Sequence, residues 1–153
     1  MNAIQQRLLR FLRTHRVLNL AVVGSRGQPH AAAVFYAADD KMRLYILSDP
    51  ATRHGAAMLL EGRVAGTVQR DRQDWKTIHG VQLHGRCWVL KGVARERAWA
   101  VLIKRFPFLN HGNVELRLAL EKTALWAIEP DWMRLISNRP SFGHKLEWKR
   151  RHR

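Results

Sequence analysis

A hydroxyl, a guanidinium and an imidazole follow one another at residues 52–54, shortly after an apolar segment at 44–48. The apolar segment has the composition of a buried strand, and residues 52–61 have that of a short helix. The first turn of a helix carries free backbone N–H groups and the positive end of the helix dipole. Thr52, Arg53 and His54 would add a hydroxyl donor and two cationic groups there, so the junction suits a phosphate. The alternative is a plain helix start with solvated basic side chains.

The elements that would position these groups are mostly short strands. Apolar runs bounded by turn-forming residues predict strands at 17–23, 28–37, 42–48, 63–69, 77–91, 124–128 and 132–136. We expect a turn at 129–131, between the last two of these strands. Apolar residues at helical spacing predict helices at 3–14, 52–61, 93–105 and 113–122. Consecutive strands joined by tight turns favour an antiparallel sheet, and closure into a barrel would remove its exposed edges.

Length and composition indicate one ordinary globular unit. The 153 residues suit a single domain, which we place at 1–148, followed by a basic tail at 149–153. The only cysteine, Cys87, excludes an internal disulfide and a cysteine-rich zinc site. The first ten residues lack the apolar run of a signal peptide, and no stretch approaches the ~20 apolar residues of a membrane span. We therefore expect a soluble, cytoplasmic protein with no membrane partner.

The charge of the chain is large for a small domain and needs an explanation. The chain has 27 Lys and Arg against 12 Asp and Glu, for a net charge of +15. Nucleic acid, anionic surfaces and phosphorylated ligands are the candidates. One hypothesis is therefore a nucleic-acid or anionic-surface binding module without a redox role, although no RNA- or DNA-binding motif supports it.

Other chemical groups give weaker signals. The eight histidines form no helical i, i+4 pair and no His-x-His pair, so we predict no metal site. A haem needs only one axial ligand such as His or Cys, so haem binding stays open. Cys87 has no His–Asp support nearby in sequence, and a packed, inert thiol is the preferred interpretation.

Over residues 4–148 the chain resembles the YhbP-like (UPF0306) group of small bacterial proteins. This group belongs to the pyridoxamine 5′-phosphate oxidase-related superfamily of FMN-binding split β-barrels. The resemblance rests on residues 45–48, 52–54, 64–68, 80–85, 105–107, 125–128 and 142–145. It implies a mainly β fold with flanking helices, built on a six-stranded antiparallel Greek-key split barrel.

The resemblance also implies a site for the FMN phosphate. In the superfamily the third strand ends in a hydroxyl residue, and a Ser-Arg-Lys tripeptide follows and holds the phosphate. Ser48 matches the hydroxyl residue, and Thr52, Arg53 and His54 match the tripeptide. His54 departs from the pattern, because neutral histidine is a weaker anion partner than lysine and its charge varies near neutral pH.

The flavin ring and the assembly follow from the same resemblance. Ala32, Ala33 and Val34 would lie against the flat ring, although plain core packing is the alternative for this strand. Gln82 stands where a glutamine often contacts the flavin from the neighbouring subunit. The resemblance therefore implies a homodimer with FMN at the subunit interface.

The reaction itself is not assigned by the sequence. A reductase or oxidase activity stays open, because no residue presents itself as an acid–base catalyst. The C-terminal pattern of the pyridoxal-forming oxidases is not clearly present, so we do not assign vitamin B6 oxidation. FMN is the cofactor that the resemblance implies, with FAD, a deazaflavin or haem as alternatives.

Overall fold

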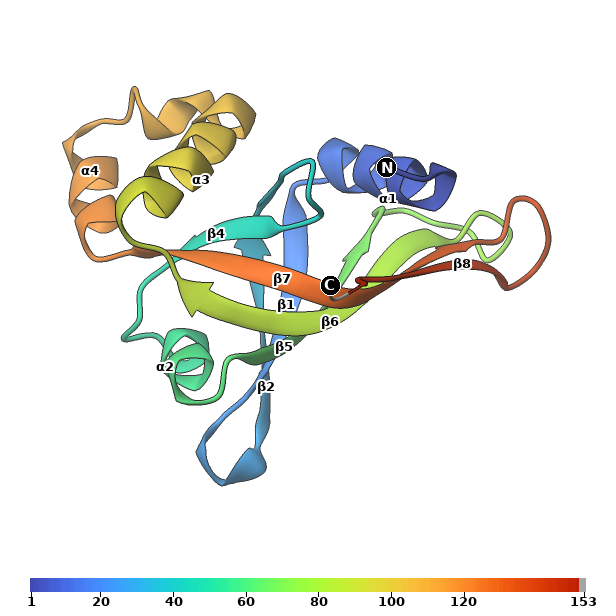
Figure 1. Cartoon of the computed structure of the whole chain (residues 1–153), viewed down its shortest axis with the longest axis horizontal. Helices are drawn as coiled ribbons and strands as arrows, with labels where there is room; N and C mark the ends of the chain where they lie inside the picture. The colour runs from blue at the N-terminus through green and yellow to red at the C-terminus, as the bar shows by residue number, and fades with distance from the viewer. Residues whose placement is uncertain (152–153) are drawn as a thin grey trace.

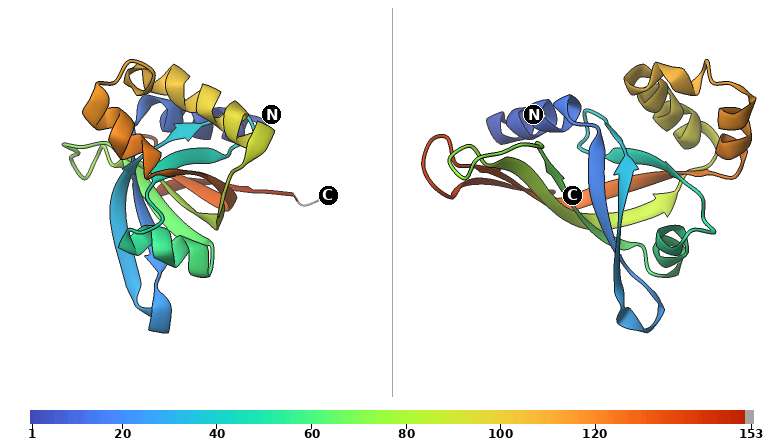
Figure 2. Two further views of the ribbon diagram at one scale, coloured as in Figure 1. Left: turned by 90° about the vertical axis from the view of Figure 1, so that its left-hand side faces the viewer. Right: turned by 180° about the vertical axis from the view of Figure 1, so that it is seen from behind.

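The computed structural model describes residues 1–151, and it shows a strongly curved sheet with helices around it (Figures 1 and 2). The helices are α1 (Ala3–Thr14), α2 (Arg53–Leu60), α3 (Gly92–Arg105) and α4 (Val114–Glu121). The strands are β1 (Val17–Val23), β2 (Pro29–Phe35), β3 (Ala37–Ala38), β4 (Leu44–Ser48), β5 (Arg63–Gln69), β6 (His79–Val89), β7 (Ala124–Ser137) and β8 (His144–Lys149). Each predicted helix is present, with bounds that differ by one residue at most. Within residues 1–151, none of the helices is long and apolar enough to cross a membrane.

The sheet is antiparallel and curls back on itself. Its strand order is β2-β1-β5-β6-β7-β4-β3, and β8 pairs with β7 outside this path. Only Tyr36 separates β2 from β3, so the two ends of the order come from one stretch of chain. The buried Tyr36 donates a hydrogen bond to the carbonyl of Leu12 in α1, with an oxygen-to-oxygen distance of 2.7 Å. This inward step ends β2 and turns the chain across the barrel opening.

The split-barrel class predicted from the sequence is confirmed, but the sheet has eight strands and not six. The two additional strands have separate causes. The chain predicted as one strand at 28–37 is divided at Tyr36 into β2 and β3, and β8 adds a strand after residue 143.

The main core fills the barrel between two helices. Alternate residues of β1, namely Leu18, Leu20 and Val22, point inward and are buried. Helix α1 packs its apolar stripe onto this interior, and α2 contributes Ala57 and Met58. In the views of Figures 1 and 2, α1 lies above the sheet and α2 below it. Helix α1 begins with a capping box, because Asn2 and Gln5 each accept the other's backbone N–H.

A second, smaller core lies outside the barrel under α3. Ala98 and Leu102 of α3, with Phe106 directly after the helix, pack with Tyr45 of β4 and Leu125 of β7. Phe106 ends α3 because Pro107 follows it and cannot continue the helix. This packing holds α3 and the following α4 beside the end of β4.

The turn predicted at 129–131 is wrong, because β7 runs without interruption through this segment. It pairs with β6 on both sides of Pro130, and the register shifts between His84 and Gly85. A Cβ on Gly85 would collide with the carbonyl oxygen of Glu129. Glycine therefore lets the two backbones approach at the irregularity, which is where a sheet tolerates a proline without an N–H.

Strand β8 has no counterpart among the predicted strands. It pairs with the second half of β7, and Trp148 is buried in the strand that this pairing forms. Lys149, the first residue of the expected tail, is the last residue of β8. Residues 152 and 153 of that tail lie outside the described part of the chain.

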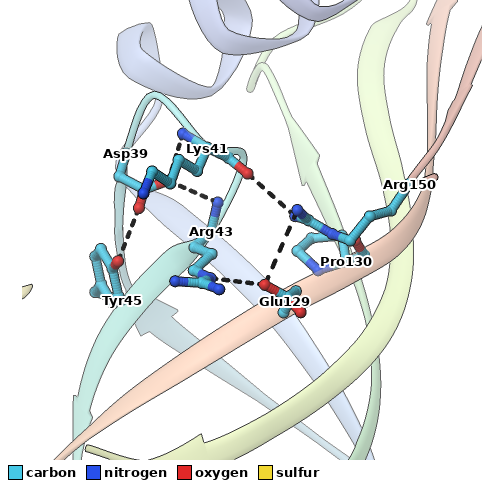
Figure 3. A network of polar contacts seen from close by, with 7 residues as sticks. All are labelled: Asp39, Lys41, Arg43, Tyr45, Glu129, Pro130 and Arg150. Carbon is cyan, nitrogen blue, oxygen red and sulfur yellow. Dashed lines mark hydrogen bonds and ion pairs between the residues drawn. The ribbon is translucent and has the colours of Figure 1, made fainter. Parts of the chain in front are cut away.

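The turn before β4 is organised by one carboxylate. Asp39 accepts the backbone N–H groups of Lys41 and Arg43, each at 2.9 Å, and the hydroxyl of Tyr45 at 2.8 Å (Figure 3). Burial, followed by this contact with Asp39, raises the pKa of Tyr45 to about 12. The turn is thus fixed by side-chain contacts to its own backbone.

Charged side chains connect this turn to β7 and to the end of β8. The Nε of Arg43 lies 2.6 Å from a carboxylate oxygen of Glu129. Arg150 donates to the carbonyls of Pro130 at 2.9 Å and Lys41 at 3.1 Å (Figure 3). The segment that follows β8 is therefore attached to the barrel by hydrogen bonds from the Arg150 side chain to backbone carbonyls.

Candidate functional site

The predicted phosphate site lies where β4 ends and α2 begins. Ser48 is the last residue of β4 and is buried. Its carbonyl accepts a hydrogen bond from the indole N–H of Trp126 on the neighbouring β7, at 3.1 Å. The strand end is thus fixed from the side by a fully buried tryptophan.

The start of α2 is built around Thr52 and Gly55. Thr52 is the N-cap, and its hydroxyl accepts the N–H of Gly55 at 3.1 Å while it donates to the carbonyl of Asp49 at 2.7 Å. A Cβ on Gly55 would lie 2.8 Å from the Cα of Pro50, so the tight approach requires glycine. Within residues 1–151 the backbone N–H groups of Arg53 and His54 have no acceptor. Two donors therefore remain available at the positive end of the helix.

The imidazole of His54 meets the hydroxyl at the end of β4. Its Nε2 lies 2.7 Å from the Oγ of Ser48 and 3.4 Å from the Oγ1 of Thr52. The ring of His30, on β2, stacks nearly parallel to it with a centroid distance of 6.3 Å. Burial, and then the proximity of His30, lower the pKa of His54 below its usual range. His54 is therefore a neutral hydrogen-bonding group at pH 7 in this state.

An apolar pocket of about 460 Å³ opens beside His54. We call it the α2 pocket. It is bounded by the end of β2, by the end of β4 and by the inner sides of α3 and α4, with Ala33, Val34, Phe35, Leu47, Leu102 and Phe106 among its lining residues. His54 is thus shared by the polar junction and by a hollow of the size that ligand pockets usually have.

The structure brings most of the predicted site residues together. Ser48, Thr52 and His54 are in contact, and Ala33 and Val34 line the α2 pocket beside them. Arg53 is exposed on the first turn of α2, where its side chain faces solvent.

Two predicted residues neither line the α2 pocket nor contact the polar junction within one chain. Ala32 alternates with Ala33 along β2 and pairs with the buried Leu20, so it is on the inward face. Gln82 lies on the outward face of β6, between Thr67 and Arg134 in the sheet register.

The sequence analysis did not identify His30 or the walls supplied by α3 and α4. His30 has a sequence signal, since the two-residue spacing of a strand places it on the same side of β2 as Ala32 and Val34. Leu102 of α3 and Leu116 of α4 have none, because they read as ordinary apolar helix residues and reach the pocket only by tertiary packing.

Cys87 fits the interpretation of an inert thiol. It is buried in β6, and burial raises its pKa to about 11. Among the described residues, no three His, Cys, Asp or Glu side chains are grouped to hold a metal ion.

Comparison with known proteins identifies the family. The family model described as pyridoxamine 5′-phosphate oxidase matches residues 4–137. A UPF0306 protein from Yersinia pseudotuberculosis serotype O:3 (strain YPIII) is 32% identical over 142 residues, which cover 92% of this chain and 90% of that protein.

Solved structures share the fold at low sequence identity. A heme binding protein from Mycobacterium smegmatis superposes with a TM-score of 0.79 at 14% identity, covering 97% of this chain. This chain spans only 59% of that protein's length. HutZ, the heme storage protein from Vibrio cholerae, superposes with a TM-score of 0.68 at 15% identity, covering 83% of this chain and 89% of HutZ.

Proposed function

Because the chain belongs to the pyridoxamine 5′-phosphate oxidase family, we propose that it binds FMN as a homodimer and holds the phosphate at the start of α2. The observation that carries this proposal is that His54 lies both in the polar junction with Ser48 and on the wall of the α2 pocket. A ligand with a phosphate at one end and a flat apolar ring at the other would fill both parts.

The phosphate would be held by donors from one turn of chain. The free N–H groups of Arg53 and His54 would point at it, and the Arg53 guanidinium would add a charge-assisted contact. The Thr52 hydroxyl is engaged in the helix cap, so we assign it the role of fixing this turn. His54 would exchange its contact with Ser48 for one with the phosphate and would take up a proton.

The ring would lie in the α2 pocket against β2. Ala33 presents only a methyl group there, and Phe35 and Phe106 form an aromatic wall with ring centroids 5.5 Å apart. Small side chains let a flat ring approach the backbone of the strand, and aromatic rings contact its edge. When bound, a flavin supplies hydride and electron transfer, while these residues orient it and exclude water.

The homodimer would form across the outward face of the sheet. The outward side chains of β2 and β5 are all exposed, and many of them are small. One register row crosses this face, in the order Ala33, Asn19, Thr67, Gln82 and Arg134. A two-fold axis on this row would place Gln82 of one subunit beside Ala33 of the other. This arrangement supports the role of Gln82 as a contact to the flavin from the neighbouring subunit.

Titration of the purified protein with FMN tests the proposal through Arg53. Replacing Arg53 with alanine should weaken FMN binding by roughly 1.5–3 kcal/mol, the usual contribution of a hydrogen bond to a charged group. Arg16→Ala is the matched control. Arg16 is also exposed, and its substitution removes the same charge away from the site. Flavin fluorescence quenching gives both dissociation constants. No FMN binding at tens of micromolar would contradict the proposal, as would an equal loss in both variants.

Haem is the second candidate for the same site. It is supported by the parallel rings of His30 and His54 next to an apolar pocket, since one imidazole suffices as an axial ligand. The Mycobacterium and Vibrio proteins with this fold are described as a heme binding and a heme storage protein. A Soret band on addition of haemin, lost in His30→Ala and His54→Ala and paired with weak FMN binding, would favour haem.

A further inference from the structure

A second hollow lies on the other side of the molecule, between α1 and the ends of β6, β7 and β8. It has a volume of about 320 Å³, and we call it the α1 pocket. It shares no lining residue with the α2 pocket. The FMN site proposed at the α2 pocket therefore does not account for the α1 pocket.

The floor of the α1 pocket is apolar and aromatic. Phe11 and Leu135 are buried there, 5% and 6% exposed. The ring of Phe11 stacks on His15 with a centroid distance of 4.0 Å and an interplanar angle of 21°. The ring of His79 is also next to Phe11, with its centroid 4.6 Å from that of Phe11. Three rings thus form one continuous wall of the hollow.

The rim of the α1 pocket is cationic. Arg7 and Arg10 from α1 line it, together with Arg70, which directly follows β5. None of the three makes an ion pair with a carboxylate within residues 1–151, and no acidic side chain lines the hollow. Charges that converge without a partner on a concave surface attract an anion.

The two histidines of the wall also fit an anionic ligand. The Nδ1 of His15 lies 2.8 Å from the carbonyl oxygen of Phe11, which can only accept, so Nδ1 carries the hydrogen and the ring is fixed. Burial, and then Arg139, Arg70 and His15, lower the pKa of His79. A bound anion would offset this concentration of positive charge.

We propose that the α1 pocket binds a small aromatic anion, a flat ring that bears a carboxylate or phosphate group. The ring would lie on the wall of Phe11, His15 and His79, and the anionic group would meet Arg10 and Arg70 at the rim. Arginine suits this role because its planar fork makes paired hydrogen bonds to carboxylate and phosphate oxygens. The inference is independent of FMN, since it uses no residue of the α2 pocket.

Isothermal titration with 2-naphthoate and with its neutral counterpart 2-naphthalenemethanol tests the proposal. The carboxylate should bind at least tenfold more tightly than the alcohol. Arg70→Gln should weaken naphthoate binding about tenfold, the usual loss when one charge-assisted hydrogen bond is removed. Arg117→Gln is the matched control, because Arg117 is exposed on α4 and does not line the α1 pocket.

Three outcomes decide the matter. A loss in Arg70→Gln that Arg117→Gln does not share, with unchanged thermal stability, supports the proposal. Equal affinity for the carboxylate and the alcohol would overturn it, and so would equal losses in both variants, which would indicate general attraction to a basic protein. Arg53→Ala should keep full affinity for naphthoate, while Arg70→Gln should keep full affinity for FMN. These reciprocal results separate a failure of this inference from a failure of the proposed function.

Discussion

At the scale of single residues, His54 is the side chain on which the candidate site depends most. The superfamily pattern has lysine at this position, and lysine keeps its charge at neutral pH. Here the imidazole is half-buried and hydrogen-bonded to Ser48, and burial lowers its pKa. The proposed phosphate site would therefore bind strongly only when His54 takes up a proton on binding.

Proton uptake makes FMN affinity depend on pH in a predictable direction. The free-state pKa of His54 lies below its usual range, and a bound phosphate would raise it, so binding is favoured as pH falls. The phosphate itself titrates near pH ~6 and acts in the opposite direction. The phosphate titrates in the same way with the wild type and with His54→Gln. Comparing their fluorescence titrations therefore isolates the contribution of His54. Between about pH 8 and pH 6 the variant should lose up to roughly tenfold in affinity relative to the wild type.

His54→Lys supplies the complementary control. Its charge is permanent in this range, so FMN binding at pH ~8 should be tighter than in the wild type. A constant affinity ratio between the wild type and His54→Gln across the range would contradict the assignment of His54 to the phosphate.

At the scale of elements, the irregular pairing of β6 with β7 is the feature on which the sheet depends most. We call this irregularity the β6–β7 crossing. Both strands are long, and they stay paired through the irregularity at Gly85 and Pro130. The crossing carries β7 from the side of β4, where the candidate site lies, to the side of β8 and the α1 pocket. Gly85 therefore lies where β7 passes from one end of the molecule to the other.

Gly85→Ala should destabilise the fold because the new Cβ would meet the backbone of Glu129 and Pro130, which cannot move aside cheaply. We expect a loss of about 1–3 kcal/mol in the free energy of unfolding, as for other overpacked sites. Urea denaturation followed by circular dichroism measures it. Gly24→Ala is the control, since the nearest atoms to its Cβ belong to the flexible Gln28 side chain at 3.3 Å. A loss within about 0.5 kcal/mol in both variants would show that the crossing tolerates a side chain.

At the scale of the whole molecule, one face of the barrel has no cover from the described part of the chain. Helices α1 and α2 close the interior and α3 lies over β4 and β7, but the outward residues of β2 and β5 stay exposed. Phe35, at 57% exposed, lies at the edge of this face beside the α2 pocket. A second copy of the chain would bury the face and complete the pocket in one step.

Ala65→Glu tests this assembly because Ala65 lies near the middle of the face, between Ala21 and His84 in the register. A carboxylate there would be buried in the dimer without a partner, so the dimer should dissociate to monomer and FMN affinity should fall at least tenfold. Size-exclusion chromatography with light scattering gives the oligomeric state. Ala100→Glu, on the exposed side of α3, is the control and should stay dimeric. A monomeric wild type, or a dimeric Ala65→Glu with full FMN affinity, would exclude this face as the interface.

Local features of the chain were the ones that sequence reasoning predicted well. Helix α1 follows from its apolar spacing and its Asn2–Gln5 cap, and α2 begins beside the hydroxyl and basic residues that pointed to a phosphate. The failures involve long-range pairing. The segment at 129–131 contains a proline between two apolar runs and reads as a turn, and only its pairing with β6 keeps it in a strand.

The sequence by itself determined the barrel class, the family and the polar junction from Ser48 to His54, because each depends on neighbouring residues or on a pattern spread over the whole chain. The tertiary structure decided what surrounds that junction. The walls from α3 and α4, the approach of His30, the burial of Trp148 in β8 and the cationic α1 pocket all join residues far apart in the chain. Burial and proximity set the charge of His54 and the shape of both pockets, and neither quantity exists until the strands have paired.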